Sequence, residues 1–269
     1  MYDLQIQIIN YNTKKYLEDC LSGLFSDLKG SGLKYKALVL DNNSEDDLRD
    51  TEEKFSGEDI SFYYSKKNLG FGGGHNFLSS KAESRNILIL NSDLKFIQPD
   101  TVKSMYDRLN KGGEFSVIGP MLVVEDLSRQ EFDHGELTGI YSWVKNNYGS
   151  SYWKPRDSEA EAAWVSGAVF MCDKSVFEKI GGFDEKFFLY KEEEDLCKRI
   201  RESGNKILYY PETHIMHIGH VVARRSSHFS ESMDYYIAKH FEKNMSYKIL
   251  NTIKKIKDIS LYGKVQSRS

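Results

Sequence analysis

The stretch Ile87-Leu88-Ile89-Leu90-Asn91-Ser92-Asp93 decides the fold of this chain. Four consecutive apolar residues predict a strand that is buried on both faces, as in parallel sheets covered by helices. The carboxylate of Asp93 follows at the end of that strand, where open α/β sheets bind their ligands. Asp93 is therefore a candidate ligand of a metal ion or a phosphate, and a residue that merely caps a turn is the alternative.

Strand and helix patterns alternate on both sides of this run. Short apolar runs are separated by stretches with apolar residues at helical spacing, or by polar stretches that begin with an Asx-rich turn. The expected elements are strands at 4–9, 36–40, 60–64, 86–90 and 115–121, and helices at 14–28, 45–55 and 76–82. The alternation predicts an α/β fold with a doubly wound, mostly parallel sheet.

The second half of the chain is less regular. Residues 124–163 are polar and aromatic, which predicts an inserted loop or an edge hairpin. Order returns with an apolar run at 164–171, followed by a short helix that ends at Gly181-Gly182, a helix at 192–203, a strand at 206–210 and a basic helical tail.

The composition limits the class of protein. The 269 residues are 40% hydrophobic, enough for a full core, and the net charge of -3 disfavours a nucleic-acid binder. Three cysteines without CxxC spacing indicate reduced core thiols, as in a cytoplasmic protein, rather than disulfides or a zinc site. We expect neither a signal peptide nor a membrane span, because no apolar run approaches the roughly 20 residues that cross a bilayer.

A glycine-rich stretch, Asn68-Leu69-Gly70-Phe71-Gly72-Gly73-Gly74-His75, follows the third expected strand. It is not a dinucleotide-binding fingerprint, because a GxGxxG frame that starts at Gly70 ends on His75 and the loop does not follow the first strand. The glycines instead favour a loop whose backbone amides approach an anionic ligand at a helix start. A flexible turn is the alternative.

The acidic block Glu192-Glu193-Glu194-Asp195 is the second chemical feature. It can supply a carboxylate for proton transfer, and together with Asp93 it suggests group transfer from a diphosphate-activated donor. The dipole at a helix start favours ionised carboxylates, whereas four adjacent acids repel one another, so the sequence leaves the direction of the pKa shifts open. The solvated start of a helix is the alternative.

Several motifs in a fixed order resemble the family-2 glycosyltransferases of the GT-A fold, especially the bacterial rhamnosyltransferase-like branch. The resemblance spans about residues 4 to 240, and the ordered set is far more specific than any one motif. The motifs are Ile9-Asn10-Tyr11-Asn12, Val39-Leu40-Asp41-Asn42-Asn43-Ser44, Asn68-Leu69-Gly70-Phe71-Gly72, Leu90-Asn91-Ser92-Asp93, Trp164-Val165-Ser166-Gly167-Ala168, Ile180-Gly181-Gly182-Phe183-Asp184-Glu185 and the segment 187–199.

The resemblance implies a domain organisation. We expect one GT-A domain over residues 1–240, with a nucleotide-binding part at about 1–121 and an acceptor-side part at about 122–240. Residues 241–269 would form a basic helical extension.

The resemblance also assigns roles to residues. Asp93 would help to coordinate a divalent metal, Mg²⁺ or Mn²⁺, on the donor diphosphate. Trp153, Trp164 and Gly167 are the acceptor candidates; core packing is the favoured alternative for Trp164. Trp153 is the better candidate and belongs to a segment, 141–153, whose aromatic side chains suit the apolar faces of sugar rings. The nucleotide-binding candidates are Asn10, Tyr11, Asn12, Asp41, Asn43, Asn68, Gly70, Gly72, Asn76 and Ser92.

In the family the catalytic base is the second acid of a Glu-Asp pair, and the register of 187–196 puts it at Glu193. The chain departs from the family here, because glutamate replaces the usual aspartate; Glu192 and Asp195 are the other candidates. A second departure is Lys239, where the family often has arginine. Lysine keeps the charge but lacks the guanidinium fork for bidentate phosphate contact.

Three histidines recur every three residues, at 214, 217 and 220. Neutral imidazole is a common metal ligand, but Mg²⁺ and Mn²⁺ prefer oxygen-rich shells, so at most one histidine is expected to join Asp93. His217 and His220 are the candidates. Arg224 and Arg225 follow and could close over the donor phosphates, or be solvated.

The resemblance implies that one sugar is moved, with inversion, from a UDP- or dTDP-linked donor to a hydroxyl group. The acceptor would be a saccharide or a polyprenyl-diphosphate-linked saccharide in bacterial surface polysaccharide synthesis, such as lipopolysaccharide or capsule. Glu193 would take the proton from that hydroxyl as it attacks the anomeric carbon. The alternatives are a sugar nucleotidyltransferase and a non-catalytic carbohydrate-binding protein of the same fold.

The basic tail suggests where the protein works. Residues 239–269 hold eight Lys/Arg against two acids, in a protein of net charge -3. Ile249, Ile253, Ile256 and Ile259 repeat at helical spacing, so an apolar stripe could lie in an anionic membrane surface. We therefore expect a cytoplasmic protein that is peripheral on the inner face of the cell membrane; a helix packed on the domain or on a second subunit is the alternative.

Overall fold

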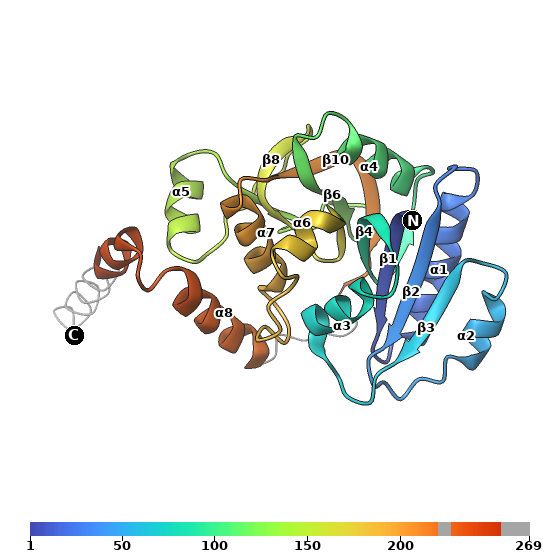
Figure 1. The fold of residues 1–269 in the computed structure, drawn as a ribbon. Coiled ribbons are helices and arrows are strands. Elements are labelled where there is room, and N and C mark those ends of the chain that lie inside the picture. The colour runs from blue at the N-terminus through green and yellow to red at the C-terminus, as the bar shows by residue number, and fades with distance from the viewer. Residues whose placement is uncertain (220–226, 254–269) are drawn as a thin grey trace.

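The computed structural model describes residues 1–219 and 227–253, and Figure 1 shows a central sheet with helices packed around it. The helices are α1 (Lys14–Leu28), α2 (Arg49–Lys54), α3 (Gly70–Ser79), α4 (Thr101–Asn110), α5 (Ile140–Asn147), α6 (Lys174–Lys179), α7 (Glu192–Glu202) and α8 (Ser227–His240). The strands are β1 (Tyr2–Asn10), β2 (Tyr35–Asp41), β3 (Ile60–Tyr64), β4 (Ser84–Asn91), β5 (Leu94–Phe96), β6 (Phe115–Val123), β7 (His134–Glu136), β8 (Ala160–Val165), β9 (Val169–Asp173) and β10 (Lys206–His217).

The sheet has the strand order β3-β2-β1-β4-β9-β6-β10-β8-β7, with β5 beside β10. Strands β1 to β4 run parallel to one another, and β6 runs parallel to β10. The predicted α/β class is confirmed, but the sheet is mixed rather than mostly parallel, because β9 runs antiparallel to β4 and β6.

Strand β9 enters the sheet at the edge where β4 ends. Residues 166–168 connect β8 to β9. The Asn91 amide donates to the Ala168 carbonyl over 2.9 Å. The turn 166–168 is thereby placed at the edge of the sheet that carries the polar motifs.

Strand β4 is buried on both faces, as its four apolar residues predict. Leu88 and Leu90 belong to a core shared with α1 and α4. Ile87 and Ile89 belong to a second core shared with α6 and α7. One sheet therefore contains strands from both expected parts of the domain, the part before residue 121 and the part after it.

Helix α3 starts earlier than the expected 76–82, because the glycines form its first turns instead of a loop before it. Glycine is a poor helix former, so tertiary packing overrides propensity here. A Cβ on Gly74 would lie 2.5 Å from Ile9 Cδ1, so this position lets the helix approach β1 closely.

Helix α2 is shorter than the expected 45–55. The Asp46 carboxylate accepts hydrogen bonds from the Lys14 amide at 2.9 Å and from Asn10 Nδ2 at 3.1 Å. Residues before 49 are therefore held in a turn against β1. The sequence patterns also did not predict β5 and α4, and the expected hairpin at 124–163 contains β7, α5 and β8.

Strand β10 continues past the expected end at residue 210 to His217. Its pairing with β6 shifts between Tyr210 and His214, which accommodates Pro211 in the strand. The extension brings His217 opposite Leu94, one residue after Asp93.

Helix α8 precedes the expected extension at 241–269, and the extension is helical over 245–253, as expected. Residues 254–269, which carry much of the predicted basic tail, lie outside the described residues. In the described part of the chain, no helix is long and apolar enough to cross a membrane. Cys20, Cys172 and Cys197 are buried free thiols, as the sequence predicted.

Candidate functional site

The candidate site begins at the carboxyl-terminal edge of β1, β2 and β4. Asn10 pairs with Asp41 in the ladder, and its Nδ2 donates to Asp41 Oδ2 over 3.0 Å. Thr13 Oγ1 donates to Asn10 Oδ1 over 2.9 Å and lies 2.8 Å from Ser92 Oγ. The structure therefore brings together three of the expected nucleotide-binding residues, Asn10, Asp41 and Ser92, from three strand ends.

The turns after β1 and β2 present exposed polar groups at this edge. Asn12 and Asn43 both have left-handed backbones, with φ of 58° and 63°. Asn12 Oδ1 accepts from the Glu45 amide over 2.7 Å, which ties the two turns together. The Tyr11 ring is 37% exposed beside them, available to a ligand.

A buried amide that the sequence patterns did not single out connects β2 to α3. Asn42 Nδ2 donates to Asn68 Oδ1 at 2.9 Å and to the Gly70 carbonyl at 3.2 Å. Asn42 Oδ1 accepts from the Leu69 amide at 2.8 Å. The signals for Asn42 were its place in the Asx-rich run and in the motif at 39–44, and its side chain holds Asn68 at the edge.

Three other expected nucleotide-binding residues face protein instead. A Cβ on Gly70 would lie 2.5 Å from the Phe188 carbonyl oxygen, and a Cβ on Gly72 would lie 2.8 Å from Phe183 Cβ. The Asn76 side chain exchanges two 2.9 Å hydrogen bonds with the backbone of Phe183. In the structure these residues bind the segment that leads into α7, which explains the glycines by packing.

Asp93 and His217 lie side by side at the end of β4. The Asp93 side chain is largely buried, and its Oδ1 lies 3.3 Å from His217 Nε2. Burial raises the pKa of Asp93, but the adjacent His217 ring outweighs that effect and the pKa lies below its usual range. His217 Nδ1 is 2.8 Å from Gln130 Oε1, and its Nε2 is 3.3 Å from Asn91 Nδ2.

This arrangement fits a divalent cation with open positions. Gln130 Oε1 can only accept, so the His217 Nδ1 carries a proton, and Nε2 and Asp93 Oδ1 are both acceptors unless a proton or a metal lies between them. No group of three or more His, Cys, Asp or Glu that could hold a metal occurs within residues 1–219 and 227–253. Asp93 and His217 would thus supply one oxygen and one nitrogen, and phosphate or water the rest.

His214, which was not among the predicted metal ligands, pairs with a glutamine: its Nδ1 is 2.8 Å from Gln98 Oε1. His220, Arg224 and Arg225 lie outside the described residues.

The acidic block forms the first turn of α7, and its members differ in environment. Glu192 is buried, on the same helical face as Leu196, and one of its oxygens, Oε2, has no hydrogen-bond partner. Glu194 is held by Lys191 Nζ at 2.6 Å and by Ser151 Oγ at 2.7 Å. Glu193 is half-buried and forms no salt bridge with the described residues.

Burial is the main cause of the shifted acidity in this block. It raises the pKa of Glu193 to about 7, and the charge of Glu194 adds to the shift. Burial raises the pKa of Glu192 well above its usual range, with the charge of Glu193 as the next cause. A carboxyl group that titrates near neutral pH suits a general base.

The turn 166–168 brings Glu193 to the edge of the sheet. Ala168 accepts from Asn91, and a Cβ on Gly167 would lie 3.6 Å from Glu193 Cβ and 3.1 Å from Phe71 Cζ. Gly167 thus separates the proposed base from the end of β4 by the width of one residue without a side chain. The sequence motifs at 90–93, 164–168 and 192–195 meet here.

Asp195 lies in a different setting, which argues against it as the base. Its side chain is fully buried and accepts from Arg199 at 2.8 Å, Lys239 at 2.6 Å and His240 at 2.7 Å. Burial raises the pKa of Asp195, but these three basic side chains outweigh it and leave the pKa below its usual range. Lys239 also binds Asp184 at 2.7 Å, so it ties α8 to the domain instead of facing a phosphate.

The expected acceptor residues are also distributed differently. Trp164 is 6% exposed and belongs to the second core, so it is a packing residue. Its indole packs against Gly135, a position where a side chain would collide with it. Trp153 is half-buried and donates from Nε1 to Asp133 Oδ1 over 2.9 Å.

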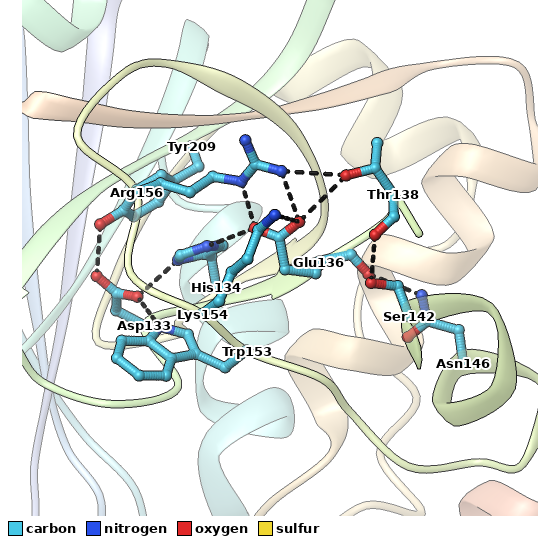
Figure 2. Close-up of polar contacts among 10 residues, drawn as sticks. All are labelled: Asp133, His134, Glu136, Thr138, Ser142, Asn146, Trp153, Lys154, Arg156 and Tyr209. Atoms are coloured by element: carbon cyan, nitrogen blue, oxygen red, sulfur yellow. Dashed lines mark hydrogen bonds and ion pairs between the residues drawn. The ribbon is translucent and has the colours of Figure 1, made fainter. Parts of the chain in front are cut away.

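A buried polar network that the sequence did not predict lies beside Trp153 (Figure 2). Asp133 accepts from Trp153 and from the Tyr209 hydroxyl at 2.8 Å, and it lies 2.7 Å from His134 Nδ1. The Glu136 carboxylate pairs with Arg156 beside it. Its members come from β7, β10 and the segment after α5, so no local pattern could have revealed it.

Comparison with known proteins shows which families and structures this chain is similar to. A family model described as Glycosyl transferase family 2 matches residues 6–193. The chain is 28% identical over 213 residues to the low-salt glycan biosynthesis hexosyltransferase Agl10 of Haloferax volcanii, an alignment that covers 76% of this chain and 64% of that protein. It is 25% identical over 236 residues to the rhamnosyltransferase WbbL of Escherichia coli K12, covering 83% of this chain and 87% of that protein.

A third relative is the N-acetylglucosaminyl-diphospho-decaprenol L-rhamnosyltransferase of Mycobacterium tuberculosis, 26% identical over 142 residues, or 49% of this chain and 46% of that protein. The chain thus spans about half of that relative and just under two thirds of the Haloferax protein. Among solved structures, the mannosyltransferase PcManGT of Pyrobaculum calidifontis in complex with GDP-Man and Mn²⁺ is similar in fold. The TM-score is 0.64 at 14% identity, over 88% of this chain and 64% of that chain.

Proposed function

We propose, from the premise that this chain belongs to glycosyl transferase family 2, that it moves one sugar from a nucleoside-diphosphate donor to a hydroxyl group with inversion. The observation that carries the proposal is the meeting of Glu193, the Gly167 turn and the end of β4 at one edge of the sheet. A base, a narrow space and a diphosphate-binding edge are what such a transfer requires.

The donor nucleoside is proposed to lie against the ends of β1 and β2. Tyr11, Asn12 and Asn43 are exposed there, and the network of Asn10, Asp41 and Ser92 positions them. Asn68 completes this surface through its bond to Asn42. A UDP- or dTDP-linked sugar is the donor we propose.

Asp93 and His217 are proposed to hold Mg²⁺ or Mn²⁺ against the donor diphosphate. The fit rests on two facing acceptor atoms, Asp93 Oδ1 and His217 Nε2. When bound, such a cation would stabilise the charge that develops on the diphosphate leaving group. The mannosyltransferase PcManGT, which shares the fold, was solved with Mn²⁺.

Glu193 is proposed to remove the proton from the acceptor hydroxyl. Its oxygen then forms a bond to the anomeric carbon as the bond to the diphosphate breaks on the opposite face, which inverts the configuration. Gly167 packs closely against Phe71 and Glu193 at this edge, and the half-buried Trp153 would offer an aromatic face to the acceptor.

The acceptor is proposed to be a saccharide or a polyprenyl-diphosphate-linked saccharide in surface polysaccharide synthesis. The name of the mycobacterial relative contains a diphospho-decaprenol, and the other relatives act in glycan synthesis or are rhamnosyltransferases. A lipid-linked acceptor would place the protein on the inner face of the cell membrane.

The test is product release from a panel of UDP-, dTDP- and GDP-sugars with Mn²⁺ and a mixture of saccharide and polyprenyl-linked acceptors. We expect acceptor-dependent release of a nucleoside diphosphate, slowed by about 10² to 10⁴ in Glu193→Gln. Release of pyrophosphate would instead indicate a nucleotidyltransferase, and absence of turnover with every pair would indicate a carbohydrate-binding protein.

A further inference from the structure

Helix α5 has its polar side turned toward the protein and its apolar side turned toward solvent. On the inner side, Ser142 Oγ donates to the Thr138 carbonyl at 2.7 Å and Asn146 Nδ2 donates to the Glu136 carbonyl at 2.8 Å (Figure 2). On the outer side, Ile140, Tyr141 and Trp143 are 67%, 72% and 51% exposed. A surface helix of a soluble protein normally shows the reverse.

The helix at 245–253 repeats this arrangement. Met245, Ile249 and Ile253 are 69%, 53% and 45% exposed, and their spacing of four residues places them in one stripe. Tyr247, on the other side, contacts the Phe241 ring of the domain at 6.3 Å. Six large apolar side chains are thus exposed on two short helices.

The two helices contact each other through side chains next to the exposed ones. The Tyr148 ring, at the end of α5, lies 5.6 Å from the Tyr247 ring, and its hydroxyl donates to Asn251 Oδ1 over 3.5 Å. A Cβ on Gly149 would lie 2.8 Å from Ile237 Cγ1 of α8, so the chain after α5 packs closely on α8. Figure 1 shows α5 on the same side of the molecule as α8 and the C-terminal helix.

The charges around this surface are positive. Lys145 on α5 and Lys248 on the second helix are exposed beside the apolar side chains. By sequence, residues 239–269 carry a net charge of +6 in a protein of net charge -3. Trp and Tyr with flanking Lys are typical of segments that lie in a membrane interface, and basic residues add attraction to anionic lipids.

We infer that the outer face of α5 and the stripe at 245–253 together insert into the surface of an anionic bilayer. In this inference α5 helps to hold the protein at the membrane surface. It rests on the proposed function only in its purpose, which is access to a lipid-linked acceptor. A second copy of the chain is a poorer occupant, because two such surfaces would bring like charges together.

The first experiment is flotation of the full chain with phosphatidylcholine vesicles that contain or lack phosphatidylglycerol, without donor or acceptor. The Ile140→Ser/Trp143→Ser double variant should reduce partitioning into anionic vesicles by more than about tenfold, because two large apolar side chains lose their burial. Ile97→Ser is the matched control, since Ile97 is 41% exposed before α4, outside this surface, and it should bind as the wild type does. Thermal unfolding checks that each variant is folded.

The second experiment keeps the proposal testable even if the double variant does not fold. Lipids brominated on the acyl chains should quench the Trp fluorescence of the wild type, and Trp143→Phe should remove that quenching while vesicle binding persists, since Trp164 is buried and Trp153 half-buried. High salt should weaken binding without abolishing the quenching of the bound fraction.

The inference is overturned if the double variant floats like the wild type, or if bromolipid quenching is absent or unchanged in Trp143→Phe. It is also overturned if the wild type does not bind anionic vesicles and light scattering shows that it is a dimer which the double substitution converts to a monomer. Because vesicle binding is measured without sugar transfer, inactivity toward every donor would refute the proposed function and leave this result standing.

Discussion

Replacing Glu193 with glutamine tests the proposed base most sharply. Gln has nearly the same shape and can still fill the space beside Gly167, but it cannot accept the acceptor's proton. Loss of a general base lowers turnover by about 10² to 10⁴, equivalent to roughly 3–5 kcal/mol of transition-state stabilisation. The donor affinity should change little, because the proposed nucleoside and diphosphate contacts lie at the ends of β1, β2 and β4.

The dependence of turnover on pH tests the raised pKa of Glu193. Burial and the charge of Glu194 raise the pKa of Glu193 to about 7, and the base works only when it is ionised. Turnover should therefore fall about tenfold for each pH unit below 7 and level off above it. Glu193→Gln should remove this acidic limb together with most of the rate.

Glu194→Gln is the matched control. It removes the charge that helps to raise the pKa of Glu193, so the acidic limb should move to lower pH while the plateau rate changes little. Steady-state turnover, as nucleoside diphosphate released, and donor binding by calorimetry measure these effects. If Glu193→Gln keeps its rate and Glu194→Gln loses it, the base is Glu194 and the family register used here is wrong.

Three further variants test the neighbouring groups. Asp93→Asn should weaken the apparent affinity for Mn²⁺ by at least about tenfold with little change in unfolding temperature, and wild-type activity at limiting Mn²⁺ would refute the metal role. Glu192→Gln should unfold at a higher temperature than the wild type at pH 8. The pKa of Glu192 is raised in the folded protein, so the wild type loses stability as the pH rises above 4.5, the ordinary pKa of this carboxyl group. The gain in unfolding temperature should vanish below pH 4.5, and an equal gain at both pH values would exclude this cause. Lys239→Met should lower the free energy of unfolding by about 1–3 kcal/mol, because Asp184 and the buried Asp195 lose a shared partner. Lys239→Arg should keep most of the wild-type stability. Equal stability of the two variants would contradict a stabilising ion pair at Lys239.

Local patterns predicted the parallel half of the sheet well. Helix α1 and strand β3 have the bounds that the apolar residues indicate. Helix α1 buries one regular set of side chains, which include Leu17, Leu21 and Leu24. Helix α3 was placed too late, since its glycines lower helix propensity and only the close approach to Ile9 explains them. The second half of β10 was not predicted because Pro211 interrupts the strand pattern. A shift in the pairing of β10 with β6 accommodates the proline.

The candidate site was predictable where strand ends converge. Asn10, Asp41 and Ser92 follow strands that were recognised from sequence, so their meeting at one edge follows from the topology. The contact of His217 with Gln130, by contrast, joins residues far apart in the chain, and no spacing encodes it. For Trp164 the sequence left an acceptor role and core packing open, and the structure places the residue in the core.

A crystal of the protein with Mn²⁺ and a nucleoside diphosphate, examined at the manganese absorption edge, tests the central claim most directly. The account predicts one anomalous peak bonded to Asp93 and His217, with the diphosphate on it and the nucleoside against the ends of β1 and β2. A peak remote from both side chains, or a nucleotide bound away from this edge of the sheet, would contradict the account.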